Sequence, residues 1–130
     1  MFTLQEARKT LPFVKKIIAD IVESQKAFNR VTQEIQNTSN SEDKRRKIFD
    51  KERLKGNLTE YQEELDLVGC HLKIPALGIV GYYSDPGDGL VVELCWKYGD
   101  DDIYYWQQIG QDELLPLEKL YQRSDSKNLA

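Results

Sequence analysis

The chain has 130 residues, enough to bury one hydrophobic core but not two. Charged side chains make up 31% of it and the formal net charge is −4, which is typical of a soluble protein and disfavours nucleic-acid or anionic-lipid partners. The first residues carry charge and lack the apolar stretch of a signal peptide, and no apolar run is long enough to span a bilayer. Two cysteines are too few for a disulfide framework or a zinc knuckle. We therefore expect a cytoplasmic protein without membrane association, cofactor or metal.

The N-terminal third predicts a short helix followed by a long one. Thr3 and Glu6 have the spacing of a capping box, which marks a helix start. Pro12 disfavours a helical residue before it, so the first helix should be short, and Pro12 suits the first turn of a second helix. Apolar residues then recur at helical spacing, at Val14, Ile17, Ile18, Ile21, Val22, Phe28, Val31 and Ile35.

Residues 37–43 are polar and predict a loop, in which Ser39 to Glu42 offer a second capping box. Another helix should then extend to about Val68. Its apolar residues end in the spacing of a coiled-coil seam, at Ile48, Leu54, Leu58, Tyr61, Leu65 and Val68. Because the connecting loop is short, the two helices should form an antiparallel hairpin over about residues 11–68.

After Gly69 the period changes from helical to that of strands. Three β-rich segments, at 78–83, 90–97 and 103–109, are separated by turns at 85–89 and 99–102. These segments predict a three-stranded antiparallel β-meander over about residues 78–109. A short helix is expected over about 114–122, opened by Pro116, and residues 124–130 should form a flexible tail. Residues 1–123 then form a single α+β domain.

Lengths place the meander on the base of the hairpin, near Gly69. Each long helix should span roughly 40 Å, but strands of this length reach only about 25 Å. The widest apolar stripe lies at the base, whereas the distal half has a stripe wide enough for one partner helix only. We therefore expect this half to protrude or to pair with a second copy in a homodimer. The candidate interaction seam consists of Phe28, Val31, Ile35, Ile48 and Leu54.

Three polar motifs have a structural interpretation that we prefer to a functional one. The basic segment from Lys44 to Lys55 is interleaved with acidic residues and predicts a solvated helix face. His71, the sole histidine, follows Cys70, but sequence neighbours point in different directions and so do not form a nucleophile–base pair. The triplet Asp100 to Asp102 lacks the alternating oxygens of a calcium loop and predicts a turn. We assign no catalytic residue and no metal ligand.

The strand residues can be sorted into two faces if Leu94 lies opposite Trp106 and Trp96 opposite Tyr104. One face is then a core against the helices, made of Val80, Tyr82, Leu90, Val92, Leu94, Trp96, Tyr104 and Trp106. The other face is mixed and partly polar, and it is where a ligand site is expected. The candidate ligand-binding residues on this outer face are Glu93, Lys97, Tyr105 and Gln107.

The segments FTLQEARKTLP and GLVVELCWKYGD, with Tyr105-Trp106, resemble the domain of unknown function 2203 family of small prokaryotic proteins. The resemblance covers Phe2 to about Ile109 and implies a fold but no activity. In the family, a His usually follows the Tyr-Trp pair and an Asp lies in the strand at 78–83, whereas this chain has Gln107 and Gly81 there. With Gly81, Glu93 and Gln107 in one row, the resemblance implies an acid–imidazole site around Glu93 that this chain has lost or altered.

These observations lead us to expect a non-enzymatic interaction or assembly module that acts through its helical hairpin. The alternative is a small-molecule binding protein, or a weak hydrolase, that uses the outer face of the sheet near Glu93. Nucleic-acid binding through the basic segment from Lys44 to Lys55 is a third hypothesis, which the interleaved acidic residues disfavour.

Overall fold

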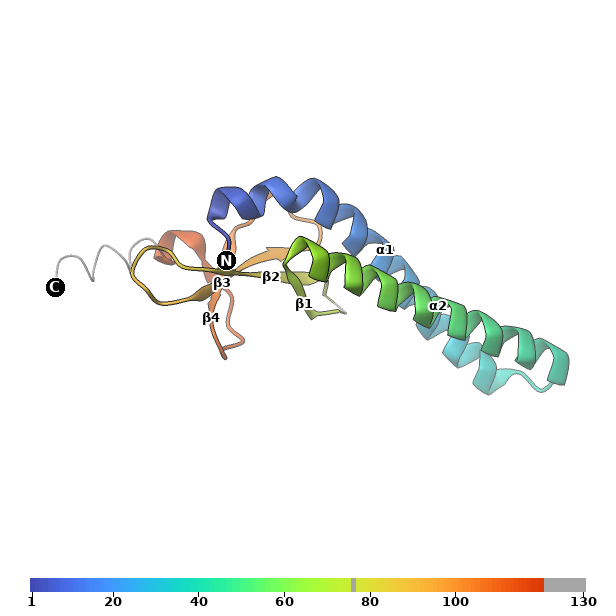
Figure 1. Ribbon diagram of the computed structural model, residues 1–130. Helices are drawn as coiled ribbons and strands as arrows, with labels where there is room; N and C mark the ends of the chain where they lie inside the picture. Colours follow the sequence, from blue (N-terminus) through green and yellow to red (C-terminus); the bar gives the residue numbers. More distant parts are fainter. Residues whose placement is uncertain (76, 121–130) are drawn as a thin grey trace.

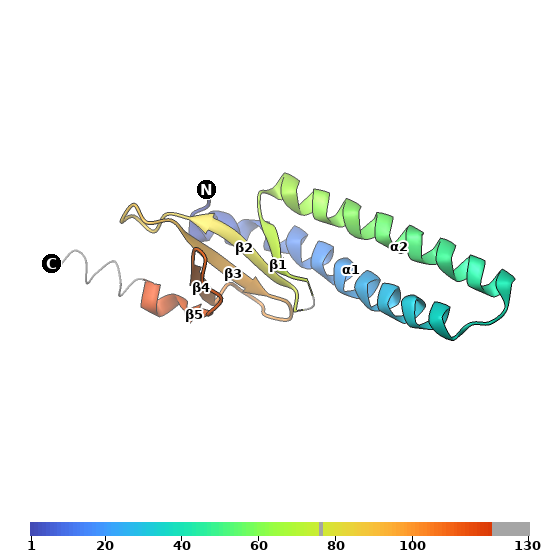
Figure 2. The same ribbon diagram turned by 90° about the horizontal axis from the view of Figure 1, so that it is seen from below.

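The computed structural model describes residues 1–75 and 77–120, which form an α+β fold (Figure 1). Helices α1 (Leu4–Asn37) and α2 (Ser41–Val68) pack side by side as a hairpin. The strands that follow form one antiparallel sheet in sequential order, from β1 to β5. Figure 2 shows the sheet at the base of the hairpin, with the connection between the helices projecting far beyond it. The predicted architecture is therefore confirmed.

Helix α1 corrects the prediction of two helices divided at Pro12. It is continuous, it begins at the predicted capping box, and it contains Pro12 in its interior. Proline inside a helix costs about 3 kcal/mol because it removes one hydrogen bond. Here the ring lies on the exposed side, where the carbonyl that it leaves free can bind water, while the buried stripe continues through Leu11 and Val14. The apolar burial on both sides of Pro12 outweighs the lost bond.

Helix α2 begins one residue away from the predicted cap. Asn40, and not Ser39, is the N-cap, and its side-chain oxygen accepts hydrogen bonds from the backbone N–H groups of Glu42 and Asp43. The helix ends at Val68 as predicted, and Gly69 follows in the left-handed conformation that closes helices (φ 100°). Lys47 bonds to Glu34 across the hairpin, at 3.3 Å.

In the described part of the chain the sheet has five strands, where the sequence predicted three. The central strands are β2 (Ile79–Ser84), β3 (Val92–Lys97) and β4 (Tyr105–Gln108). The two edge strands, β1 (His71–Ile74) and β5 (Leu115–Pro116), were not predicted, because a four-residue and a two-residue strand carry too little pattern. Residues 117–120 are helical, in agreement with part of the predicted C-terminal helix. The rest of that helix and the tail at 124–130 lie outside the described residues.

The inner face of the sheet packs on α1 and the end of α2. Leu94 pairs with Trp106, which confirms the predicted register. Six of the eight residues predicted for this face are buried, namely Val80, Tyr82, Val92, Leu94, Trp96 and Trp106. Leu90 and Tyr104 lie outside the strands and are about half exposed, so the prediction was wrong for both. The helical side of the core consists of Ala7, Leu11, Val14, Ile18, Ile21 and Leu65.

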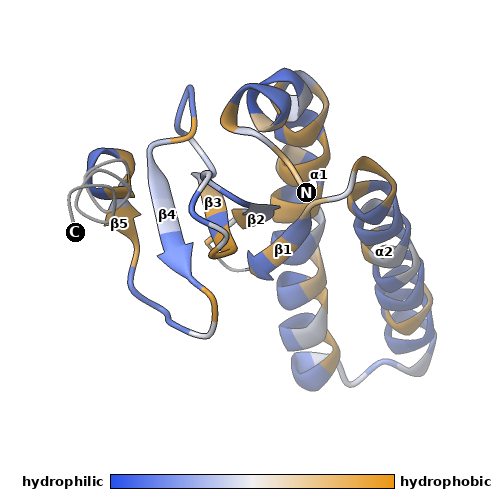
Figure 3. Ribbon diagram, turned by 60° about the vertical axis from the view of Figure 1, so that its left-hand side comes forward, coloured by the Kyte–Doolittle hydropathy of each residue, from blue (hydrophilic) through white to orange (hydrophobic). Residues whose placement is uncertain are grey.

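Apolar residues are distributed unevenly along the hairpin. Figure 3 shows hydrophobic colouring concentrated in α1 next to the sheet, whereas α2 is largely hydrophilic. In the distal half, Val31 and Leu54 are buried by the packing of the two helices on each other, each at 8% exposure. Within the described part of the chain, neither helix is apolar enough over its length to cross a membrane.

Candidate functional site on the outer face of the sheet

Glu93 is the centre of a polar cluster on the face of the sheet that points away from the helices. Although it is charged, the residue is only 5% exposed. One carboxylate oxygen, Oε2, lies 2.8 Å from His71 Nε2 and 2.9 Å from Lys73 Nζ. Both partners come from β1, the edge strand that packs beside α2. A buried carboxylate needs such partners, because an unpaired buried charge is strongly destabilising.

Gly81 provides the space in which this cluster sits. A Cβ atom at residue 81 would lie 2.5 Å from Glu93 Oε2, 2.9 Å from His71 Nε2 and 3.0 Å from Lys73 Cδ. The first two distances are shorter than Cβ contacts in folded proteins. The carboxylate and the imidazole therefore occupy the position that a side chain on the neighbouring strand would otherwise fill.

The His71 ring is held in one orientation by two contacts. Glu93 Oε2 also forms an ion pair with the Lys73 ammonium, so the carboxylate is a charged acceptor. In its bond with His71, Nε2 of the ring is therefore the donor. The ring stacks on Tyr83, with centroids 4.8 Å apart and planes inclined by 26°. In the neutral ring the proton is thus on Nε2, and Nδ1 is left with a free lone pair. Among the described residues, Nδ1 has no hydrogen-bond partner.

The predicted ligand-binding residues are only partly brought together. Gln107 lies directly opposite Glu93, and Tyr105 lies opposite Cys95 two pairs further along the same two strands. Lys97 is at the other end of β3, where it pairs with Ile79, and its side chain is exposed. The structure therefore places Gln107 beside Glu93 and leaves Lys97 apart from both.

The predicted row of Gly81, Glu93 and Gln107 was wrong by two residue pairs. Tyr83 lies opposite Glu93, whereas Gly81 pairs with His71 and Cys95. Residues 81, 93 and 107 nevertheless share a face of the sheet. The chain has Gly81 and Gln107 where the resemblance implies an Asp and a His, yet Glu93 does have an imidazole neighbour. His71 provides one from β1, a strand that the sequence did not reveal.

Gln107 is almost completely buried, and only one of the two polar atoms of its side-chain amide has a hydrogen-bond partner among the described residues. Its Nε2 donates a hydrogen bond to the backbone carbonyl of Asp112, at 2.8 Å. Its Oε1 is buried and has no partner among the described residues. The loop after β4 therefore covers this end of the outer face, and the face is neither flat nor fully solvated.

The surroundings of the two cysteines disfavour the thiolate form. Both are free and buried, and burial raises the pKa of the Cys70 thiol to about 11 and that of the Cys95 thiol to about 12. Thiolates, not thiols, are the reactive species. His71 is bonded to Glu93, and within the described part of the chain it has no hydrogen bond to either cysteine.

The Asp100 to Asp102 segment forms the turn between β3 and β4 and contacts helix α1. Asp102 accepts a hydrogen bond from Arg8 Nε at 3.1 Å, and Lys15 Nζ donates to the backbone carbonyl of Asp101 at 2.8 Å. The structural interpretation of the triplet is therefore supported. Within the described residues, no group of three or more histidine, cysteine and acidic side chains could hold a metal ion.

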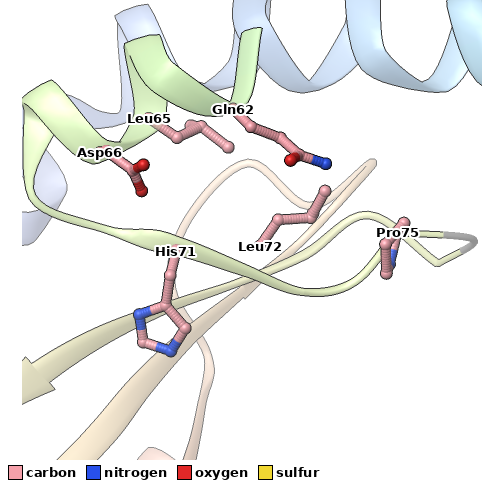
Figure 4. A pocket seen from close by; sticks show the side chains of 6 residues that line it. All are labelled: Gln62, Leu65, Asp66, His71, Leu72 and Pro75. Carbon is pink, nitrogen blue, oxygen red and sulfur yellow. The ribbon is translucent and has the colours of Figure 1, made fainter. Parts of the chain in front are cut away.

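A hollow of about 200 Å³ adjoins the cluster, between the end of α2 and strand β1 (Figure 4). Its lining consists of Gln62, Leu65, Asp66, His71, Leu72 and Pro75. Figure 4 shows Asp66 and His71 at one end of it and Pro75 at the other. Sequence reasoning missed His71 and Lys73 as site residues. The alternation of polar and apolar residues in His71 to Ile74 is the one signal that could have placed both on the same face.

Fold and site together define a class of α+β protein with a protruding helical hairpin, a five-stranded meander and a buried carboxylate paired with histidine and lysine. Residues 1–111 match the family described as Uncharacterized conserved protein (DUF2203), so the chain belongs to the domain of unknown function 2203 family. This result confirms the resemblance seen in the sequence. Comparison with curated proteins and with solved structures gave no match.

Proposed function

We propose that this protein is a non-enzymatic assembly module and that two copies pair through the base of the helical hairpin. The observation that carries the proposal is a pair of large apolar side chains that the single chain leaves in solvent. Phe13 on α1 is 69% exposed and Leu67 on α2 is 89% exposed. They flank a hollow of about 400 Å³ whose lining also includes Ile17 and Val68. Exposed apolar surface around a groove is typical of a docking site.

The base of the hairpin is favoured over the seam that the sequence suggested. Val31 and Leu54 are buried within the hairpin of one chain, so they are not free to contact a second copy. Phe28 is half-buried and lies under the Lys51 ammonium, which is 5.3 Å from the ring centroid. Ile35 is also half-buried, which leaves Ile48 as the exposed member of the seam.

The charges around the hollow are compatible with a symmetric pair. Lys16 lies on its rim together with Asp20 and Glu64. In a two-fold interface the same patch faces itself, so a patch that carries both signs can match its own charges. Phe13 of one copy would then enter the hollow of the other, and the charged rim would surround the apolar centre.

The test is solution mass by light scattering across a wide range of protein concentration. We expect a mass of twice the 15.1 kDa of one chain at high concentration. Leu67→Ser should shift the equilibrium to the monomer without loss of fold, because the side chain contributes nothing to the monomer core. Phe49→Ser is the matched control, since Phe49 is 72% exposed on the distal half of α2. A strict monomer, or dissociation by Phe49→Ser and not by Leu67→Ser, would refute the proposal.

A second candidate function is small-molecule binding on the outer face of the sheet, with Glu93, Tyr105, Gln107 and Lys97 as the proposed ligand-binding residues. The burial of Glu93 beside His71 and Lys73 favours it, because charged groups at such positions are frequent in binding sites. The basic segment offers less support for nucleic-acid binding. Arg46 is paired with Asp43 and Lys47 with Glu34, so part of its charge is neutralised within the hairpin.

A further inference from the structure

We propose that the hollow between α2 and β1 binds a small organic ammonium ion, held between the carboxylate of Asp66 and Nδ1 of His71. This site lies beside the outer face of the sheet and shares no lining residue with the groove around Leu67. It therefore goes beyond both candidate functions, and it can fail or succeed independently of dimer formation.

The first support is the fixed acceptor on His71. Glu93 Oε2 accepts a hydrogen bond from His71 Nε2–H and Tyr83 covers one face of the ring, so the imidazole presents Nδ1 as a hydrogen-bond acceptor at one end of the hollow. The His71 side chain remains 33% exposed, which leaves room for a ligand to reach it. Glu93 acts here as a positioning residue, because it sets the ring orientation and tautomer without contact with the ligand.

The second support is the sign of the charge around the hollow. Asp66 lies in the last turn of α2, its carboxylate makes no ion pair with a described residue, and that turn carries no basic side chain. The C-terminal end of a helix is itself partly negative, so a cation is favoured at this position. Lys73 does not oppose this charge strongly, because its ammonium is paired with Glu93.

The third support is the match between the donors of an ammonium group and the acceptors present. Asp66 and Nδ1 of His71 are both acceptors, and an alkylammonium ion brings three N–H donors. Leu65, Leu72 and Pro75 form the apolar part of the lining, against which a short alkyl chain can pack. A volume of about 200 Å³ is below that of sites for drug-sized ligands, so the ligand must be small.

The experiment follows the resonances of the His71 ring by NMR while n-butylammonium is added. His71 is the sole histidine of the chain, so its ring signals report on this site alone. We expect a saturable shift with n-butylammonium and no comparable shift with butan-1-ol, which has a similar shape but no charge. Equal shifts with the amine and the alcohol would overturn the proposal.

Two substitutions that each remove one negative charge distinguish a direct contact with the ligand from a general electrostatic attraction. Asp66→Asn should weaken binding by about fivefold, the upper range for an exposed ion pair. Glu63→Gln removes the same charge from the same region of α2 but lines neither groove, so it should leave the affinity unchanged. Equal weakening by both variants, or a His71 shift with zinc ions and none with the amine, would refute an ammonium site.

Gly81→Ala provides an independent check on the role of the ring. The added methyl group displaces Glu93 Oε2 and His71 Nε2 but does not touch Asp66. Binding of n-butylammonium should become weaker while the dispersion of the other resonances shows a folded protein. Unchanged affinity with a displaced ring would show that Nδ1 does not hold the ligand.

Discussion

Gly81→Ala is the most informative single substitution for the polar cluster, because two physical effects with opposite sign act on it. In a strand, alanine is normally better than glycine, and the exchange alone should stabilise the fold by about 0.5–1 kcal/mol. Gly81 does not need a positive φ, so no backbone strain opposes the exchange. Any destabilisation must therefore come from the side chains that occupy the Cβ position.

The contacts in the structure give the approximate free-energy cost of the opposing effect. The new Cβ atom would be 2.5 Å from Glu93 Oε2, so the carboxylate must move away from both His71 and Lys73. A hydrogen bond to a charged group contributes roughly 1.5–3 kcal/mol when it is buried, and less where a partner reaches solvent. His71 is one-third exposed, so we expect a loss of about 2–3 kcal/mol from the two contacts together. After the intrinsic gain, the net change should be a destabilisation of about 1–2 kcal/mol.

Urea unfolding followed by circular dichroism measures this change, and a double-mutant cycle identifies its cause. In a Glu93→Ala background the closest contact of the new Cβ atom is removed, and the His71 and Lys73 side chains are no longer held in place by the carboxylate. There Gly81→Ala should be neutral or stabilising by up to about 1 kcal/mol, which gives a coupling energy of about 1–3 kcal/mol. If Gly81→Ala is as stable as the original chain, or costs the same in both backgrounds, the cluster does not occupy the space above Gly81.

The remaining predictions concern the cap, the thiols and the core. Thr3→Ala removes the capping box of α1 and should lower the free energy of unfolding by about 1 kcal/mol in urea titration. Burial raises the pKa of Cys70 to about 11 and of Cys95 to about 12, so the folded chain keeps protons that the unfolded chain releases. The contribution of the two thiols to the free energy of unfolding should therefore be constant below about pH 9 and should fall between about pH 9 and 12. The fall should be less steep in Cys95→Ala, which has lost one of the two thiols. Ile18→Ala, fully buried under the sheet, should cost about 3 kcal/mol. Leu67→Ala should change monomer stability by less than about 0.5 kcal/mol. Similar losses of stability for Ile18→Ala and Leu67→Ala would contradict the placement of the core.

Local signals in the sequence were sufficient for the main elements. Thr3 and Glu6 define the start of α1 because a capping box depends on residues three positions apart. Gly69 ends α2, and the change of period after it separates the helical hairpin from the sheet. The pairing of Leu94 with Trp106, which we assumed because it gives the β-strands one apolar face, is the pairing in the structure.

Only the tertiary structure decided how the polar residues meet. Whether Pro12 divides α1 depended on burial along both sides of it, which a local rule cannot weigh. His71 lies 22 residues from Glu93, and their contact required a short edge strand and an empty position at Gly81. The apolar character of Leu67 is visible in the sequence, but its exposure is not, because exposure depends on which face of α2 the rest of the chain covers. Helix caps and turns depend on residues that are close in sequence, so the sequence predicts them. A polar site depends on residues that are distant in sequence and come together only when the chain packs.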